Sequence, residues 1–309
     1  MIKKYLMCLI CLFSIVGCNE KSASKENNSI LDPLLEPEIQ VVTDATVDAK
    51  KSQIFYLWKN NNMPIVTKYT TNNAGYYDDP DFRPNMIFYP VKEGIEIKGA
   101  VLICAGGAFQ FRSNDNEGFP VAKALSELGY QSFVVNYRLR PYSQQEGALD
   151  LARAVRFVKK SANDFQIDEN NIAVMGFSAG GILCGEMLLN YDGLVNGSFI
   201  DDNYHADYLD EVPIDVSAVG MIYSFYGRLS VASTDIQKFS NSDLPPTYFC
   251  YGTEDPFVEE FEKCIVALKK ADVSIEKNVL QNMPHGYGTG GHWISDFDQW
   301  LMNTFKHKN

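Results

Sequence analysis

The segment from Ile172 to Leu189 constrains the fold more than any other part of the sequence. It begins with an apolar run typical of a buried strand, continues through Gly176-Phe-Ser178-Ala-Gly180-Gly181, and ends in an apolar run with helical spacing. A Gly-x-Ser-x-Gly pattern occurs by chance in many proteins, but between a strand and a helix it predicts a nucleophile elbow. The small flanking residues permit a tight turn, so the Ser178 hydroxyl projects at a helix N-terminus. The alternative is a glycine-rich turn whose serine takes no part in chemistry.

Strand-like and helix-like segments alternate from Ser52 onward. The later strand-like runs lack polar alternation, which is typical of parallel strands covered on both faces. Segments with helical spacing lie between them, and the last amphipathic segment spans Trp293–Phe305. The sequence therefore predicts a single α/β domain, with a mostly parallel sheet and helices on both faces. The predicted strands are Ile65–Tyr69, Met86–Tyr89, Ala100–Cys104, Ser132–Asn136, Ile172–Met175, Ala218–Tyr223, Thr247–Tyr251 and Ile275–Leu280.

The N-terminal segment has the features of an export signal. Lys3 and Lys4 precede an apolar run, Tyr5–Val16, that is too short to span a bilayer, which needs roughly 20 residues. The run ends in Ile15-Val-Gly-Cys18, which resembles the lipobox of bacterial lipoproteins. An ordinary signal peptide with a chance cysteine is the alternative.

The lipobox resemblance implies an exported protein that is lipidated on Cys18. Because Asn19 follows this cysteine, the resemblance favours anchoring at the outer membrane or cell surface over the inner membrane. The segment after Cys18 is polar, contains prolines and lacks periodicity, which is typical of a tether. We therefore predict a signal peptide at 1–17, a lipidated cysteine and tether at 18–51, and a folded catalytic domain at 52–309.

Net charge and cysteine content limit the classes of partner. Asp and Glu outnumber Lys and Arg by 39 to 27, which gives a formal net charge of −12. A chain this acidic lacks the electrostatic footprint of a nucleic-acid-binding protein, so a neutral or weakly charged substrate is expected. No Cys or His spacing typical of a metal site occurs in the sequence. Apolar surroundings favour buried free thiols over disulfides for Cys104, Cys184, Cys250 and Cys264.

A nucleophilic serine needs a base and an acid that orients the base. The chain has four histidines, and His285 fits best because it lies in the loop after the last predicted strand. The chain order serine, acid, histidine places the acid in Gly252-Thr-Glu254-Asp255. We expect Asp255 to fill this role, with Glu254 as the alternative. The less favoured histidines are His205, His292 and His307.

Backbone amides that stabilise a tetrahedral oxyanion are expected from two places. One is Ala179, which follows the serine. The other is the loop after the strand Ala100–Cys104, where Gly107 and Ala108 are the candidates. Aromatic residues near predicted strand ends are candidates for a substrate-binding rim, with ordinary core packing as the alternative. They are Phe109 and Tyr226, followed by Phe111, Tyr223 and Phe225.

From about Phe55 to Phe305 the chain resembles the α/β-hydrolase serine esterases, in particular bacterial acetyl esterases and acetylxylan or feruloyl carbohydrate esterases. The segments that carry the resemblance are Leu57-Trp58, Cys104–Phe109, Glu117–Ala122, Asn136–Leu139, Asp150 with Ala154–Arg156, Gly176–Gly181, Gly252–Asp255 and His285-Gly286. The resemblance implies ester hydrolysis by Ser178, His285 and Asp255, with no metal or organic cofactor. It implies structural roles for Arg138, Asp150 and Glu117.

The chain departs from this family in the oxyanion loop. Relatives carry Pro-Gly-Gly-Gly or His-Gly-Gly-Gly, whereas this chain has Ala105-Gly-Gly-Ala108. A methyl group at Ala108 disfavours a positive φ, and it would also narrow the acyl pocket in favour of acetyl.

The expected function is removal of acetyl or other small acyl groups from carbohydrate, such as acetylated xylan, through an acyl-enzyme. A feruloyl-type esterase and a serine peptidase of the prolyl-oligopeptidase type are the enzymatic alternatives. An inactive, lipid-anchored binding protein is the alternative without catalysis.

Overall fold

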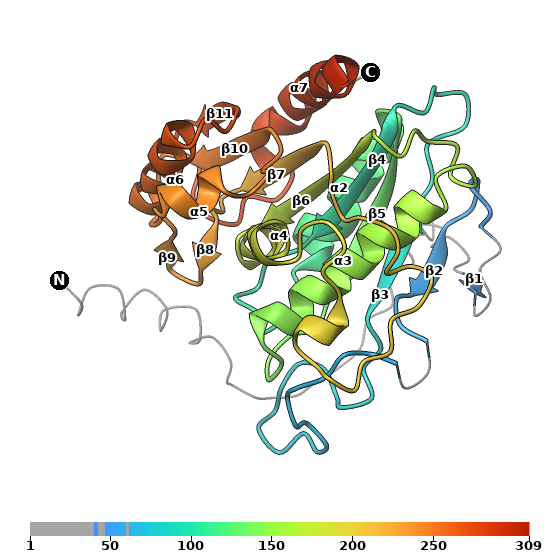
Figure 1. Cartoon of the computed structure of the whole chain (residues 1–309). Helices are drawn as coiled ribbons and strands as arrows, with labels where there is room; N and C mark the ends of the chain where they lie inside the picture. Colours follow the sequence, from blue (N-terminus) through green and yellow to red (C-terminus); the bar gives the residue numbers. More distant parts are fainter. Residues whose placement is uncertain (1–39, 43–46, 60–61, 309) are drawn as a thin grey trace, which may run out of the picture. The chain divides into compact units, whose positions relative to one another are not determined.

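The apolar runs of the sequence form the strands of one sheet, which is the centre of the fold (Figure 1). The computed structural model describes residues 40–42, 47–59 and 62–308, which belong to one compact unit. The predicted signal peptide and Cys18 lie outside the described residues.

The described part of the sheet has nine strands, joined by eight pairings. β3 runs antiparallel to both of its neighbours, and all other pairings are parallel. Every residue of the central strands β4, β6, β7 and β10 is buried, so both faces of the sheet are covered. In spatial order the strands are β1 (Gln40–Val42), β2 (Gln53–Tyr56), β3 (Asn85–Tyr89), β5 (Tyr130–Asn136), β4 (Gly99–Cys104), β6 (Ile172–Phe177), β7 (Ala218–Ile222), β10 (Thr247–Gly252) and β11 (Ile275–Leu280).

Helices cover the sheet in two groups. α3 packs against α4, and both lie in front of the sheet in Figure 1, whereas α2 packs against α7. The predicted fold class, a mostly parallel sheet with helices, is therefore confirmed. The α-helices are α2 (Phe119–Glu127), α3 (Gln144–Lys160), α4 (Ala179–Asn190), α5 (Ile236–Ser240), α6 (Val258–Lys270) and α7 (Trp293–Lys308). Shorter elements are the turns η1 (Asn114–Gly118), η2 (Gly197–Phe199) and η3 (Gly290–His292), and the hairpin β8 (Gly227–Arg228) with β9 (Val231–Ala232). No helix among the described residues is both long enough and apolar enough to cross a membrane.

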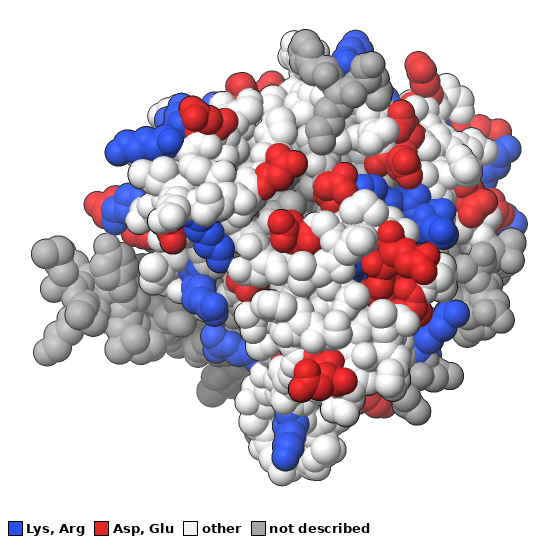
Figure 2. Space-filling view, viewed as in Figure 1, with Lys and Arg blue, Asp and Glu red and all other residues white. Residues whose placement is uncertain are grey.

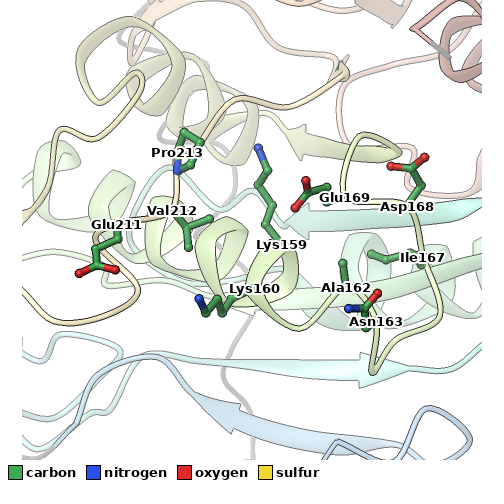
Figure 3. Close-up of a pocket in the computed structure, with 10 residues that line it drawn as sticks. All are labelled: Lys159, Lys160, Ala162, Asn163, Ile167, Asp168, Glu169, Glu211, Val212 and Pro213. Atoms are coloured by element: carbon green, nitrogen blue, oxygen red, sulfur yellow. The ribbon is translucent and has the colours of Figure 1, made fainter.

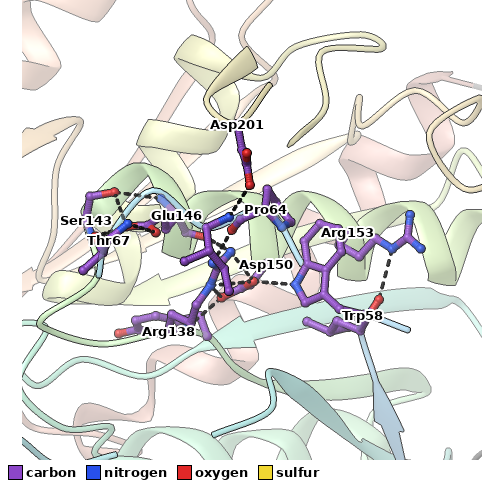
Figure 4. A network of polar contacts seen from close by, with 12 residues as sticks. Trp58, Pro64, Thr67, Arg138, Ser143, Glu146, Asp150, Arg153 and Asp201 are labelled. Atoms are coloured by element: carbon purple, nitrogen blue, oxygen red, sulfur yellow. Dashed lines mark hydrogen bonds and ion pairs between the residues drawn. The ribbon is translucent and has the colours of Figure 1, made fainter. Parts of the chain in front are cut away.

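The predicted strand Ile65–Tyr69 is wrong. This segment is irregular because the carboxylate of Glu146 on α3 binds its backbone, accepting hydrogen bonds from the amides of Val66 and Thr67 at 3.0 and 3.1 Å (Figure 4). Two side chains that the resemblance implied to be structural partners lie beneath it: Arg138 and Asp150 form a fully buried ion pair at 2.9 Å. These contacts hold the segment on α3, so it adds no strand to the sheet.

The first strand lies earlier in the chain than expected. β1 falls inside the segment predicted to be a tether, and it pairs with β2 in parallel. The boundaries of the signal, tether and domain stay predictions, but three residues of the expected tether belong to the sheet.

A hollow of about 620 Å³ lies at the amino end of β6, away from the elbow (Figure 3). Asp168 and Glu169 line it and precede β6, whereas Ser178 follows β6 at the other edge of the sheet. This hollow therefore does not belong to the candidate active site.

Candidate active site

Ser178 occupies a strained turn between β6 and α4. Its backbone has φ 49° and ψ −118°, which is unfavourable for a residue with a side chain. The turn is possible because its two flanking glycines have no side chain. A Cβ on Gly176 would lie 2.2 Å from the Gly181 nitrogen, and a Cβ on Gly180 would lie 2.0 Å from the Cys104 carbonyl oxygen. The predicted elbow geometry is therefore present, and Ser178 stands partly exposed at the start of α4.

Three side chains from separate loops meet at this turn. The Nε2 atom of His285 lies 2.9 Å from the Oγ atom of Ser178, and its Nδ1 atom lies 2.7 Å from a carboxylate oxygen of Asp255. Asp255 is only 5% exposed, and its other oxygen accepts a hydrogen bond from the Phe257 amide at 2.9 Å. A buried carboxylate held in this way fixes the orientation and tautomer of the imidazole. The arrangement allows His285 to accept a proton from Ser178.

The alternative acid and bases lie elsewhere. Glu254 is exposed, and its neighbour Asp255 makes the contact with His285. His292 is exposed at the end of η3, and His205 is exposed and contacts Asn62 through its backbone. The His307 side chain lies outside the described residues. Among the described histidines, the structure therefore brings His285 alone to Ser178.

The predicted oxyanion loop lies directly beside the serine. A Cβ on Gly106 would be 2.9 Å from the Ser178 Cβ. The loop contains three consecutive residues with positive φ, which are Gly107 at 130°, Ala108 at 54° and Phe109 at 58°. Ala108 therefore adopts the conformation that its methyl group disfavours.

Three amides at this point have no acceptor among the described residues. Within the part of the chain that the structure describes, the amides of Gly107, Ala108 and Ala179 donate no hydrogen bond. The Gly106 amide, in contrast, donates to Glu117 at 2.6 Å. Free backbone amides beside a nucleophile are the groups that can stabilise an oxyanion. The residues predicted from the sequence are thus available for this role.

The prediction that Phe109 and Tyr226 form a substrate-binding rim is wrong. Phe109 is 8% exposed and packs against Tyr137, and Tyr226 is 0% exposed and packs against Phe239. Phe109 lies in the part of the loop with a left-handed backbone, and the Tyr226 hydroxyl lies 3.2 Å from that of Thr247. Both residues belong to the core. Of the five aromatic candidates, Phe111 is the exposed one, at 47%.

Glu117 is closer to the site than the sequence alone indicated. It is 4% exposed, and its carboxylate accepts hydrogen bonds from the Gly106 amide and from the Tyr223 hydroxyl at 2.8 Å. Burial raises the pKa of Glu117, although these hydrogen bonds and the nearby His285 lower it in part. The signal in the sequence was an acidic residue shortly after a glycine-containing loop, which is too common a pattern to identify its role.

The four predicted thiols are buried and free. Burial raises the pKa of Cys250 and of Cys264 to about 12, so neither is a thiolate at neutral pH. The expectation of free thiols is confirmed for these described cysteines.

Comparisons with known proteins indicate the family of the chain. The BD-FAE family model, which describes α/β-hydrolase-type esterases, matches residues 86–243, just over half of the chain. An acetylxylan esterase of Xylanibacter ruminicola is 27% identical over 214 residues, which make up 66% of this chain and 44% of that protein. The endo-1,4-beta-xylanase B of Butyrivibrio fibrisolvens is 28% identical over 125 residues, 39% of this chain and 19% of that protein. The chain thus spans less than half the length of these two relatives.

Solved structures show the same fold. An acetyl ester-xyloside bifunctional hydrolase from Caldicellulosiruptor lactoaceticus has a TM-score of 0.61 at 23% identity and covers 82% of this chain and 95% of its own. A butyrate-bound esterase from Thermogutta terrifontis has a TM-score of 0.56 at 18% identity, with 74% and 90% covered. Together with the match to the family model and the similarity to the acetylxylan esterase, these structures confirm the predicted resemblance to α/β-hydrolase esterases.

The strain at Ala108 is testable. The substitution Ala108→Gly removes the methyl group from a left-handed position, so we expect the free energy of unfolding to rise by about 1 kcal/mol. Urea unfolding monitored by circular dichroism measures this change. As a control, Ala148→Gly in the interior of α3 is expected to lower it by at least about 1 kcal/mol, because the helix propensity falls and a fully buried methyl group is lost. A loss of stability on Ala108→Gly would contradict the loop conformation described here.

Proposed function

Because the chain belongs to the BD-FAE family of α/β-hydrolase-type esterases, we propose that it is a serine carboxylic-ester hydrolase. Ser178 is the nucleophile, His285 the general base and acid, and Asp255 the residue that orients the histidine. The observation that carries this proposal is the hydrogen-bonded chain from Asp255 through His285 to Ser178 at a strained elbow. The three free amides beside it support an oxyanion hole.

The reaction has two halves. In the first, Oγ of Ser178 bonds to the ester carbonyl carbon while Nε2 of His285 takes its proton. The carbon–oxygen bond to the alcohol then breaks, and the alcohol leaves with that proton. In the second half, water gives a proton to His285 and attacks the acyl carbon. Ser178 leaves, recovers its proton from His285, and the carboxylic acid is released.

We propose acetyl groups on carbohydrate, such as acetylated xylan, as the substrate. The names of two relatives, an acetylxylan esterase and a xylanase, support this choice. The net charge of −12 favours a neutral polymer, and Figure 2 shows acidic and basic side chains scattered among uncharged ones on one face. The methyl group of Ala108, beside the free amides, favours a small acyl group.

Acetate release from natively acetylated xylan tests the proposal. Purified residues 19–309 are expected to release acetate well above the level of the Ser178→Ala variant, because removal of such a nucleophile costs on the order of 10⁶ in kcat. The measurement is enzymatic detection of free acetate over time. Release of ferulate but not acetate would replace the acetyl assignment, and equal rates for wild type and Ser178→Ala would contradict the role of the serine.

Phe111 offers a surface for the sugar beside the oxyanion loop. A Cβ on Gly107 would lie 3.0 Å from the Phe111 ring, so this exposed ring is next to the free amides. The adjacent Arg112 is fixed by Asp78 at 2.6 Å and by the Tyr137 carbonyl at 2.8 Å, which holds the chain here in place. An exposed aromatic ring at a site is suited to stacking on a sugar.

The substitution Phe111→Ala distinguishes binding of the sugar from binding of the acyl group. We expect KM for acetylated xylan to rise about 5-fold or more, in keeping with the loss of roughly 1 kcal/mol of contact, while KM for 4-nitrophenyl acetate stays within twofold. Val266→Ala, which alters an equally exposed apolar residue on α6, serves as the control and should change neither value. If Phe111→Ala raised KM equally for acetylated xylan and for 4-nitrophenyl acetate, a sugar-binding role would be contradicted.

A further inference from the structure

The carboxylate of Glu117 joins two loops that carry different parts of the proposed machinery. Glu117 belongs to η1, after the oxyanion loop. One of its oxygens accepts the Gly106 amide hydrogen bond at 2.6 Å, and the other accepts that of the Tyr223 hydroxyl at 2.8 Å. Both partners donate, so the geometry matches an ionised carboxylate that has both oxygens engaged.

Tyr223 continues the connection to the histidine loop. Its hydroxyl accepts a hydrogen bond from the Gly288 amide at 3.3 Å. Its ring packs edge-on against the ring of His285, with 4.9 Å between centroids, and against Tyr287 at 4.6 Å. The Asn116 side chain makes a further link, donating to the Gly286 carbonyl at 3.0 Å. The loop that holds His285 is therefore fastened to η1 at several points.

The oxyanion loop needs such fastening because its backbone is strained. Residues with positive φ cost about 1 kcal/mol or more each when they carry a side chain, and they persist only where the surroundings hold them. The loop is held at Ala105 by the Tyr137 hydroxyl and at Phe109 by the Arg140 amide. Between these points, the Gly106 amide is held by the Glu117 carboxylate, immediately before the free amides of Gly107 and Ala108.

We propose that Glu117, together with Tyr223, is a positioning residue that sets the free amides of the oxyanion loop against His285 and stabilises the charged histidine formed during the reaction. This inference rests on the proposed function. It differs from a purely structural role because it includes an electrostatic effect on the base. Three charged or titratable groups face His285. They are Asp255 after β10, Glu117 in η1 and the Tyr223 hydroxyl after β7. Tyr137, after β5, also faces Glu117.

The negative charge of Glu117 affects the protonation of His285 in one direction. A carboxylate near an imidazole favours the protonated imidazolium, so its removal makes the histidine harder to protonate. The acidic limb of the kcat/KM–pH profile reports the loss of the free base. Without the charge of Glu117, this limb is expected to move to lower pH.

The variant Glu117→Gln tests the proposal on 4-nitrophenyl acetate. We expect kcat to fall by about 10- to 100-fold, with a smaller change in KM, because misplaced amides stabilise the transition state poorly. We also expect the acidic limb to move by about 0.5 pH unit or more to lower pH. Tyr223→Phe keeps the ring and the charge, so it should lower kcat without moving the limb. The matched control is Glu146→Gln, a buried carboxylate that contacts Val66 and Thr67 instead of the site, and it should change neither value beyond twofold.

Unfolding in urea verifies that Glu117→Gln is folded and supplies an independent readout. The pKa of Glu117 is raised by burial from its ordinary 4.5, so its contribution to stability is complete below pH 4.5 and is lost as pH rises through the raised pKa. Wild type should therefore lose stability relative to Glu117→Gln as the pH rises from below 4.5 through the raised pKa of Glu117.

Two results would overturn the positioning role. One is a folded Glu117→Gln variant with wild-type kcat, and the other is a lowered kcat with an unmoved acidic limb, which would leave a structural role only. Failure of the proposed function is recognised separately, because wild type itself would then show no hydrolysis.

Discussion

The close approach of α4 to the ends of β4 and β6 is the constraint on which the site depends. Gly180 lies against the Cys104 carbonyl so tightly that a Cβ there would be 2.0 Å from the oxygen. This contact brings the start of α4 over the sheet edge, forces the strained backbone at Ser178, and leaves the Ala179 amide free. The positions of the proposed nucleophile, of the helix N-terminus and of one proposed oxyanion donor are therefore consequences of this one packing contact. The strain is held by a sheet whose central strands are buried on both faces.

The rest of the site is assembled from loops at the carboxyl edge of the sheet. Asp255 follows β10, His285 follows β11, and the oxyanion loop follows β4. Because parallel strands end at a common edge, residues far apart in sequence meet there. Loops alone do not fix such positions to the accuracy that catalysis needs. In this protein a buried carboxylate, Glu117, supplies contacts between two of these loops.

The sequence predicted most of the sheet and the three central residues of the site for the same physical reason. Buried parallel strands are continuous apolar runs, and an elbow demands glycines on both sides of Ser178, so both leave a local signal. The irregular segment at Ile65 was not predictable, since its conformation depends on the Glu146 carboxylate far along the chain. The burial of Phe109 and Tyr226 likewise depends on packing partners, and the link between Glu117 and Tyr223 joins residues 106 positions apart.

The identity of the nucleophile is the central claim, and active-site labelling tests it most directly. The full chain is treated with a fluorophosphonate, which phosphonylates an activated serine, and the modified peptide is identified by mass spectrometry. The account predicts a single label on Ser178 in wild type, none on Ser178→Ala, and much slower labelling of His285→Ala, because the base that activates the hydroxyl is absent. A label on another serine, or no label on a protein that hydrolyses esters, would contradict it.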